Sequence, residues 1–150
     1  MTYSDTLNTY ALQFLRGFFI DCKLMTYTFS MEGEVPAKKN SRIVLKSGKN
    51  IPSKTYQAWH SKALAAFFYQ KFTQKLRTPL EDPLKLNFIF THGDLRCRDS
   101  DNGLSSLLDT FKDAGIIKDD NWQIIRKVCI ENEYKEKEPG VRIEITKLQL

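Results

Sequence analysis

The sequence contains few of the residues that build disulfide frameworks and zinc sites. It has three cysteines and two histidines among 150 residues. Cys22, Cys97 and Cys129 are isolated from one another, and none stands at the short spacings of zinc ligands. This usage is typical of a protein in a reducing cytoplasm. We therefore expect neither a disulfide-stapled scaffold nor a zinc finger, and we predict a cytoplasmic location.

Long hydrophobic runs are missing as well. The most apolar stretch near the start, Leu12–Ile20, is interrupted by Arg16 and followed by Asp21. It is too short to cross a bilayer, and no small-residue cleavage site follows it. We therefore expect no membrane partner and no signal peptide. With 41% hydrophobic residues, the chain is long enough for one domain with a buried core.

Several common enzyme signatures do not occur. The sequence has no glycine-rich phosphate loop and no convincing Ser/His/Asp pattern. An EF-hand that began at Asp99 would need its glycine one place after Gly103 and a glutamate where Thr110 stands. These classes of site are therefore set aside.

Charge is distributed unevenly along the chain, whose net charge is +5. Residues 25–80 hold ten Lys or Arg against two acidic residues, whereas residues 81–150 hold eleven against fourteen. A basic surface is the electrostatic footprint of a nucleic-acid-binding protein. A solvated surface explains so modest an excess equally well. Charge alone leaves both interpretations open.

The spacing of apolar residues predicts a mixed fold. Strand-like patterns cover residues 25–31, 84–90, 123–130 and 141–148. One helix is predicted from an N-cap at Ser53 to about Leu76, and a second helix stops at Gly115. Residues 43–52 are expected to form a basic loop that turns at a glycine. The order β-α-β-α-β-β predicts an α+β two-layer sandwich, a small mixed sheet flanked by helices.

Residues 1–24 stand apart from this pattern. Their apolar residues recur at helical spacing, which predicts an extra packed helix. Met25 begins a good strand and is a plausible start codon, so the segment is alternatively an upstream extension or a mis-assigned start. Both alternatives stay open. The expected domain is therefore residues 25–150, with residues 1–24 as an N-terminal extension.

Residues 98–120, RDSDNGLSSLLDTFKDAGIIKDD, place aspartates at both ends of a predicted helix. Asp99 and Asp101 are two apart, so in an extended approach both carboxylates face the same way. Asp120 reaches their cavity only if the chain folds back toward the helix start. Carboxylates without His or Cys are hard oxygen ligands, which favours Mg²⁺, with Mn²⁺ as the alternative. Such an ion acts on phosphates.

Ordinary capping and turn chemistry explains the same aspartates without a metal. Asp before a helix is a common N-cap, and an Asp-Asp-Asn sequence is an ordinary turn. Spacing alone therefore leaves the metal site and the capping interpretation open. In the metal interpretation, Arg96 and Arg98 stand where they offset repulsion between DNA phosphates and the carboxylates.

The Asp-rich stretch resembles the signature of the RusA family of Holliday junction resolvases. The shared features are an Arg-Asp-x-Asp-Asn start, a helix with Asp near its middle, an Ala-Gly stop, and Asp-Asp before a strand. VPAKKNSR, residues 35–42, is similar to the family's Pro-x-x-x-Asn-x-Arg opening. The resemblance covers roughly residues 25–148, and residues 1–24 have no counterpart in it.

The resemblance implies a Mg²⁺-dependent endodeoxyribonuclease that resolves four-way DNA junctions by paired nicks in recombination and repair. It also implies a homodimer in a bacterial or phage-infected cell. Carried over residue by residue, the catalytic and metal-binding aspartates fall on Asp99, Asp101 and Asp120, with Asp119 as a neighbour. The residues expected to contact DNA are Arg98, Arg96, Asn102, Lys38, Lys39, Arg42 and Lys118.

One position departs from the family pattern. The family commonly has a lysine four residues after the second aspartate, and this chain has Ser105 there. A lysine one helical turn on would stabilise charge on the phosphate in the transition state. The alternative function is therefore a branched-DNA-binding protein with weak or lost cleavage. Other cations that would supply the missing charge are Lys118, Lys38, Lys39 and Arg42.

Overall fold

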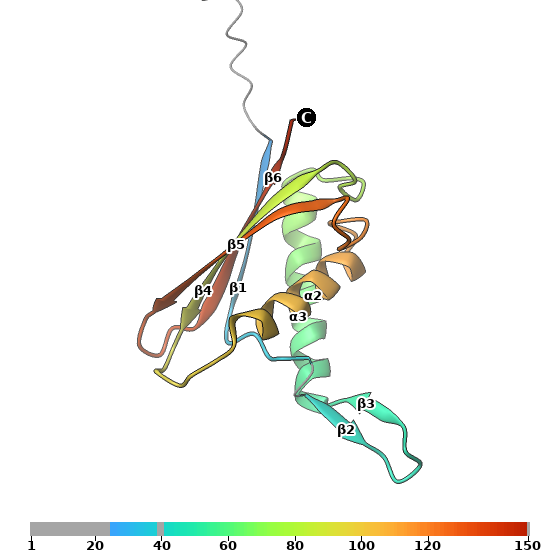
Figure 1. Ribbon diagram of the computed structural model, residues 1–150, viewed down its shortest axis with the longest axis vertical. Coiled ribbons are helices and arrows are strands. Elements are labelled where there is room, and N and C mark those ends of the chain that lie inside the picture. Colours follow the sequence, from blue (N-terminus) through green and yellow to red (C-terminus); the bar gives the residue numbers. More distant parts are fainter. Residues whose placement is uncertain (1–24, 39–40, 150) are drawn as a thin grey trace, which may run out of the picture.

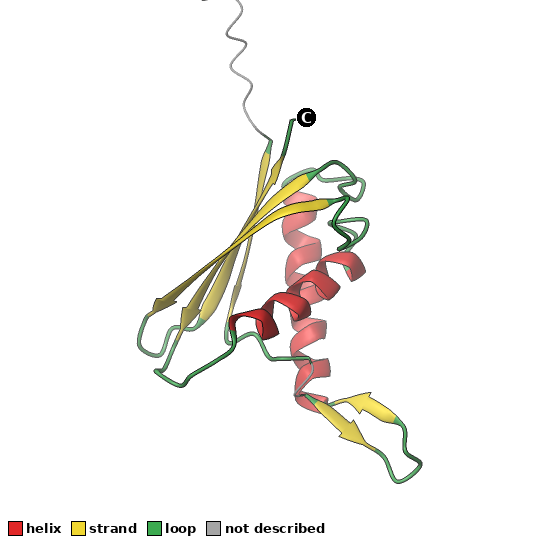
Figure 2. Cartoon of the chain, in the orientation of Figure 1, coloured by secondary structure: helices red, strands yellow, loops and turns green. Residues whose placement is uncertain are grey.

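The computed structural model describes residues 25–38 and 41–149. The expectations for residues 1–24 and for Lys39 lie outside the described residues. The described elements are, in chain order, β1 (Thr26–Glu32), β2 (Arg42–Val44), β3 (Asn50–Pro52), α2 (Lys54–Thr73), β4 (Leu84–His92), α3 (Ser100–Asp113), β5 (Ile125–Tyr134) and β6 (Gly140–Lys147). Figures 1 and 2 show both helices on one face of the main sheet, so the predicted α+β sandwich is confirmed.

The main sheet has the strand order β1-β6-β4-β5. β6 is antiparallel to both of its neighbours, whereas β4 and β5 are parallel. Parallel strands need a long crossover connection, and α3 provides it. α3 therefore begins beyond the carboxyl end of β4, at the edge of the sheet where β5 also ends (Figure 1).

The core lies between the sheet and the helices. The face of β4 predicted to be apolar is buried, with Leu84, Leu86, Phe88 and Phe90 all in the core. Three aromatic rings tie the layers together, because Phe29 of β1, Phe67 of α2 and Phe111 of α3 contact one another at centroid distances of 6.1, 5.4 and 5.0 Å. Rings of this size bury large apolar areas and pack edge to face. The cluster holds α3 against the sheet.

Gln70 of α2 and Gln74, the C-cap of that helix, bind the free edge of β1. Gln74 accepts a hydrogen bond from the Thr28 amide at 2.9 Å and donates to the Thr28 carbonyl at 2.7 Å. Gln70 makes the same pair of bonds with Ser30, both at 2.8 Å. These side-chain amides occupy the backbone groups that a further strand would bind, so Thr28 and Ser30 are not available for pairing with another chain.

The ends of both helices follow the predicted chemistry. Ser53 caps α2, since its hydroxyl accepts a hydrogen bond from the Tyr56 amide at 3.1 Å. α2 ends at Thr73, slightly before the predicted end. Gly115 stops α3 with φ +63°, and the Ile116 amide reaches back to the Phe111 carbonyl at 2.9 Å. This is a Schellman stop, which a residue with a side chain adopts at a cost.

Residues 43–52 are not the loop that the sequence predicted. They contain most of a two-stranded antiparallel hairpin in which Ile43 pairs with Ile51. Gly48 has φ +79° in the turn, which is why a glycine stands there. In the part of the chain that the structure describes, no helix has both the length and the apolarity to span a membrane.

Candidate active site

A cavity of about 500 Å³ lies where α3 begins. Its walls come from residues 34–37 after β1, the carboxyl end of β4, the loop 96–98 and the first turn of α3. Gly103 lets that turn approach the sheet closely, because a Cβ there would lie 3.0 Å from Cε1 of Phe90. Close packing of the helix start on β4 therefore positions the aspartates that precede and open the helix.

Asp99 occupies the N-cap position of α3 but does not cap it. Its backbone is extended, with φ −80° and ψ 125°, and its side chain accepts no capping hydrogen bond. The Asn102 side chain instead donates to the Asp99 carboxylate at 3.3 Å. The capping interpretation thus fails for the side chain of Asp99. Its carboxylate lines the cavity.

Asp101 lies inside α3, as the second residue of the helix. The expected extended approach is therefore wrong, because the two carboxylates belong to the N-cap and the first helical turn. Both still lie at the same end of α3, where free amide groups and the helix dipole favour negative charge. The side chain of Asp101 makes no hydrogen bond or ion pair with the other described residues.

Arg96 and Arg98 are held by an acidic residue that sequence reasoning missed. Asp94 accepts hydrogen bonds from the Arg96 side chain at 2.7 and 2.9 Å and from the Arg98 side chain at 2.8 and 3.0 Å. Bonds from Arg96, and then from Arg98, keep the pKa of the Asp94 carboxyl far below its usual range. The alternation of these three residues in the sequence was the available signal.

Glu34 and His92 were also missed. Glu34 lies 3.4 Å from the Arg98 guanidinium and 3.7 Å from Nδ1 of His92. Nε2 of His92 lies 2.9 Å from the side-chain oxygen of Asn132, on β5. These side chains, Glu34, Arg98, His92 and Asn132, all line the cavity. Its wall is therefore shared by the segment after β1, the ends of β4 and β5, and the loop before α3. The two acidic side chains Glu34 and Asp94 offset part of the arginine charge here.

Asp120 lies at the other end of α3. Its carboxylate is 2.9 Å from Nζ of Lys112, and the same amine is 3.5 Å from Asp109. The hydrogen bond to Asp120 raises the pKa of Lys112 above its ordinary value. Asp119 stabilises the turn, because its carboxylate accepts hydrogen bonds from the Asp120 amide and the Asn121 side chain, both at 2.8 Å.

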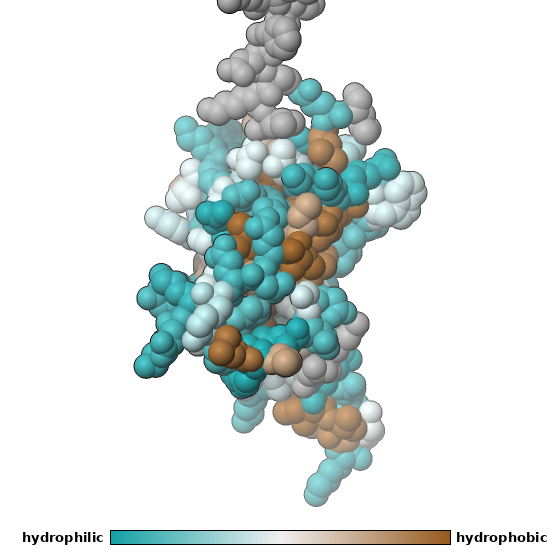
Figure 3. Space-filling view, turned by 60° about the vertical axis from the view of Figure 1, so that its left-hand side comes forward, coloured by the Kyte–Doolittle hydropathy of each residue, from teal (hydrophilic) through white to brown (hydrophobic). Residues whose placement is uncertain are grey.

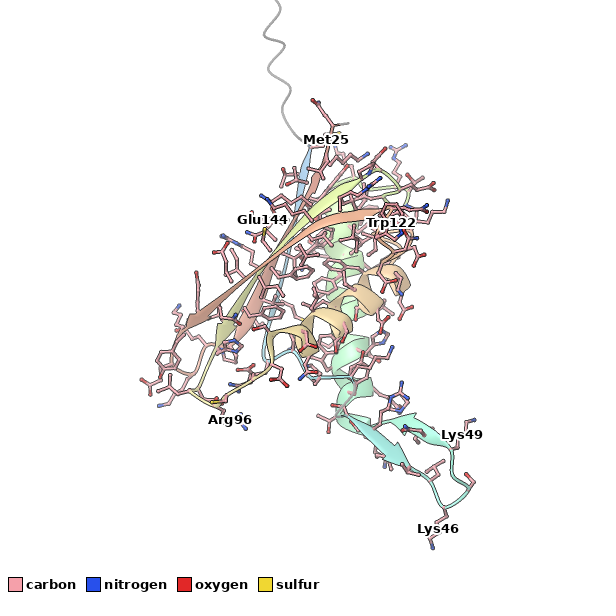
Figure 4. All side chains as sticks on the ribbon, viewed as in Figure 1. Met25, Lys46, Lys49, Arg96, Trp122 and Glu144 are labelled. Carbon is pink, nitrogen blue, oxygen red and sulfur yellow. The ribbon has the colours of Figure 1, made fainter. Side chains whose placement is uncertain are left out.

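The structure therefore places Asp99 and Asp101 at one end of α3 and Asp120 beyond the other. From Asp101 to Lys112 the backbone rises by about 16 Å along the helix. Figure 4 shows the same separation, with Arg96 near the start of α3 and Trp122, just after Asp120, beyond its end. Within the described residues, no group of three acidic, His or Cys side chains is close enough to hold a metal ion.

The other predicted DNA contacts are spread over the surface. Lys38 forms an ion pair with Asp109 on α3, Arg42 begins β2, and Lys118 pairs with Glu81 at 2.9 Å. None of the three lines the cavity. Ser105, at the place of the family lysine, lies in α3 one turn after Asp101. Its hydroxyl donates a hydrogen bond to the Asn102 carbonyl at 3.2 Å.

The donor set at the start of α3 fits a hard divalent cation. Asp99 and Asp101 offer carboxylate oxygens, and neither is paired with a lysine or arginine among the described residues. Mg²⁺ is commonly held by one or two carboxylates while it keeps several waters. Asp99 in the cavity wall and Asp101 at the same helix end therefore meet its needs. His92 and Cys97 also line the cavity, and His92 is engaged by Asn132.

Comparison with known families gives a match over most of the chain. The family model described as endodeoxyribonuclease RusA matches residues 32–146, close to the range of the predicted resemblance. Curated proteins compared one by one give no match. The matched range includes both described helices and the three aspartates at the ends of α3. Members of the family resolve Holliday junctions and generally depend on divalent metals. The chain belongs to the RusA family of endodeoxyribonucleases, and it is a nuclease.

Proposed function

We propose that this nuclease is a Mg²⁺-dependent resolvase that cuts four-way DNA junctions by paired nicks, in the cytoplasm of a bacterial or phage-infected cell. The family supports junction resolution in general. The observation that carries the finer proposal is the pair of carboxylates, Asp99 and Asp101, left without cationic partners among the described residues at the start of α3. Carboxylates that neither cap a helix nor pair with a lysine or arginine side chain are available for a metal.

The proposed roles follow from what surrounds the cavity. Asp99 and Asp101 would hold the ion, and Asn102 orients Asp99 through its hydrogen bond. When bound, the ion would polarise the scissile phosphate and lower the pKa of an attacking water. The first-turn amides and helix dipole attract the phosphate itself. Arg98, fixed by Asp94 and Glu34, faces the cavity and would position the DNA backbone.

Asp120 enters the proposal through a second copy of the chain. In its own chain it lies beyond the far end of α3 and is bound by Lys112. A carboxylate from a partner subunit completes the site without moving α3, whereas completion within one chain would require α3 to leave the core. Two copies related by a two-fold axis also supply two sites, as paired nicks require. We therefore propose a homodimer with shared sites.

The test is cleavage of a labelled four-way junction in Mg²⁺ or Mn²⁺, beside a linear duplex of the same sequence. We expect nicks in two opposite arms of the junction and none in the duplex. Asp101→Asn should abolish nicking but keep binding, since removing negative charge does not weaken attraction to DNA. Tight junction binding without nicks in either metal would instead favour a branched-DNA-binding protein that has lost cleavage, with Ser105 as its mark.

A further inference from the structure

The β2–β3 hairpin projects from the N-terminal end of α2, away from the main sheet (Figure 1). Its turn is well formed, because the Leu45 amide donates to the Lys49 carbonyl at 2.9 Å and the Gly48 amide to the Leu45 carbonyl at 2.8 Å. A left-handed glycine in such a turn is a common hairpin closure. The arm is therefore a defined element rather than a loose loop.

The hairpin exposes apolar side chains to solvent, and this exposure does not stabilise the hairpin itself. Val44 is 70% exposed, Ile43 44% and Leu45 41%. Figure 3 shows apolar surface gathered over the hairpin at the lower end of the molecule. Successive residues point to opposite faces of a strand, so the tip is apolar on both sides. A two-stranded hairpin alone is marginal in water, and exposed apolar patches mark contact surfaces.

The charge of the arm identifies the kind of partner. Arg42, Lys46, Lys49 and Lys54 belong to it or flank it, and the sequence has no acidic residue between Glu34 and Glu81. Lys46 and Lys49 stand at the outer end of the hairpin (Figure 4). A surface that combines several cations with an apolar tip suits a polyanion whose apolar groups are accessible. DNA with unstacked bases has both properties.

We propose that the β2–β3 hairpin is a DNA-contacting arm that places Val44 and Leu45 against bases at the branch point of the junction. Lys46 and Lys49 bind the neighbouring phosphates. A two-stranded ribbon fits a DNA groove, and apolar side chains that project from such an element insert between base steps. Branch-point bases cost less to unstack than bases within a duplex. This role rests on the proposed junction substrate, but it does not require that the DNA be cut.

The test uses the full chain without divalent metal and a junction with 2-aminopurine at the branch point. Binding of the wild-type protein should raise the fluorescence, because the base loses its stacking. The double variant Val44→Ser/Leu45→Ser should remove at least half of that rise and weaken junction binding about tenfold, with less than about a threefold effect on linear duplex. Val128→Ser, an exposed valine on β5, is the matched control and should change neither quantity.

A second variant tests the charges separately. Lys46→Ala/Lys49→Ala should reduce the slope of log affinity against log salt by about two, while the fluorescence rise at saturation persists. Circular dichroism of each variant should match the wild type, since these side chains lie outside the core.

The opposite results are equally clear. An unchanged fluorescence rise in the Val44→Ser/Leu45→Ser protein would overturn the proposal. A sedimentation mass of the Val44→Ser/Leu45→Ser protein that is half the wild-type mass would also overturn it, because the hairpin would then be a contact between two copies of the chain. A wild-type protein that never nicks, but whose fluorescence change depends on the hairpin, would refute only the proposed cleavage. A wild-type protein that does not bind the junction would refute both.

Discussion

The two ends of α3 carry the same residue type in opposite electrostatic situations. Toward the C-terminal end, Asp109 pairs with Lys38 and Lys112, Asp113 lies 2.9 Å from Nε2 of His60, and Asp120 also pairs with Lys112. At the N-terminal end, Asp99 and Asp101 have no such partners among the described residues.

The difference separates Asp109 and Asp113, whose carboxylates are paired within the fold, from Asp99 and Asp101, whose carboxylates have no cationic partner among the described residues. A carboxylate matched by lysine contributes to holding α3 against the rest of the fold. Two unmatched carboxylates at one helix end repel each other, and a cation relieves that repulsion. Aspartate number or spacing alone would not have separated the two groups. The predictions below test this contrast, beginning with the largest expected effect.

The first prediction compares one aspartate from each group. Asp101→Asn should lower the rate of junction cleavage by roughly a thousandfold or more, because a metal ligand is lost. Asp109→Asn should change the rate less than about threefold and lower stability instead. Single-turnover cleavage of a labelled junction measures both. A large rate loss in Asp109→Asn with unchanged folding would contradict the division.

The second prediction tests whether the two ends meet between subunits. Asp101→Asn and Asp120→Asn proteins should each be inactive alone. After unfolding and refolding together they should recover about a quarter of wild-type nicking, since a mixed dimer has one intact shared site. The recovered products should be single nicks rather than paired nicks. No recovery in a mixture that forms dimers would mean that each site is completed within one chain.

The third prediction concerns the lysine that this chain lacks. Ser105 is one helical turn after Asp101, on the same face of α3. Ser105→Lys should raise the cleavage rate about tenfold, because it adds a cation beside the reacting phosphate. Ser105→Ala is the control and should leave the rate unchanged within about twofold. An unchanged rate in Ser105→Lys, with Lys118→Ala inactive but still binding junctions, would assign that charge to Lys118.

The smallest expected effect is a pH dependence of stability. Burial would raise the pKa of Asp109, but the hydrogen bond and charge of Lys38, with Lys112, outweigh it and lower the pKa. A folded pKa below the unfolded value stabilises the protein above about pH 4, and the contribution disappears as pH falls through the folded pKa. Asp109→Asn should therefore cost about 1 kcal/mol at pH 7.

Denaturant unfolding of wild type and Asp109→Asn across pH 2.5–7 measures that contribution. The difference between the two proteins should shrink as the pH falls below about 4. The matched variant is Asp101→Asn, whose carboxylate has no cationic partner among the described residues, so it should cost less stability than Asp109→Asn at pH 7. A difference that stays constant over the whole range would mean that Asp109 acts through packing and not through its charge.

Periodic and local features of the chain were readable before the fold was known. The alternation from Leu84 to Phe90 predicted the buried face of β4, and Ser53 and Gly115 predicted where α2 begins and α3 stops. The hairpin was missed because β2 and β3 are three residues each, too short for a period to show. Its apolar and basic residues were visible, but not that they project from the body.

The sequence proposed residues for the candidate site but neither their arrangement nor the neighbours Glu34, His92 and Asp94. The motif identified Asp99, Asp101 and Asp120, and the family match covers all three. Some contacts that build its surroundings join residues far apart in sequence, since Lys38 is 71 residues from Asp109 and Glu34, which accepts a hydrogen bond from the Gly93 amide, is 59 residues from it. No spacing rule reaches such distances, because only chain packing brings those segments together.

By itself the sequence determined the four strands of the main sheet, the two described helices and the family, because these depend on periodicity, caps and a contiguous motif. The tertiary structure decided which aspartates are neutralised, and it placed Asp99 in the wall of the cavity. It also decided that the chain after α3 does not fold back to carry Asp120 to Asp101. The physical reason is that charge pairing depends on distance in space, and a 14-residue helix keeps the two ends of one motif apart.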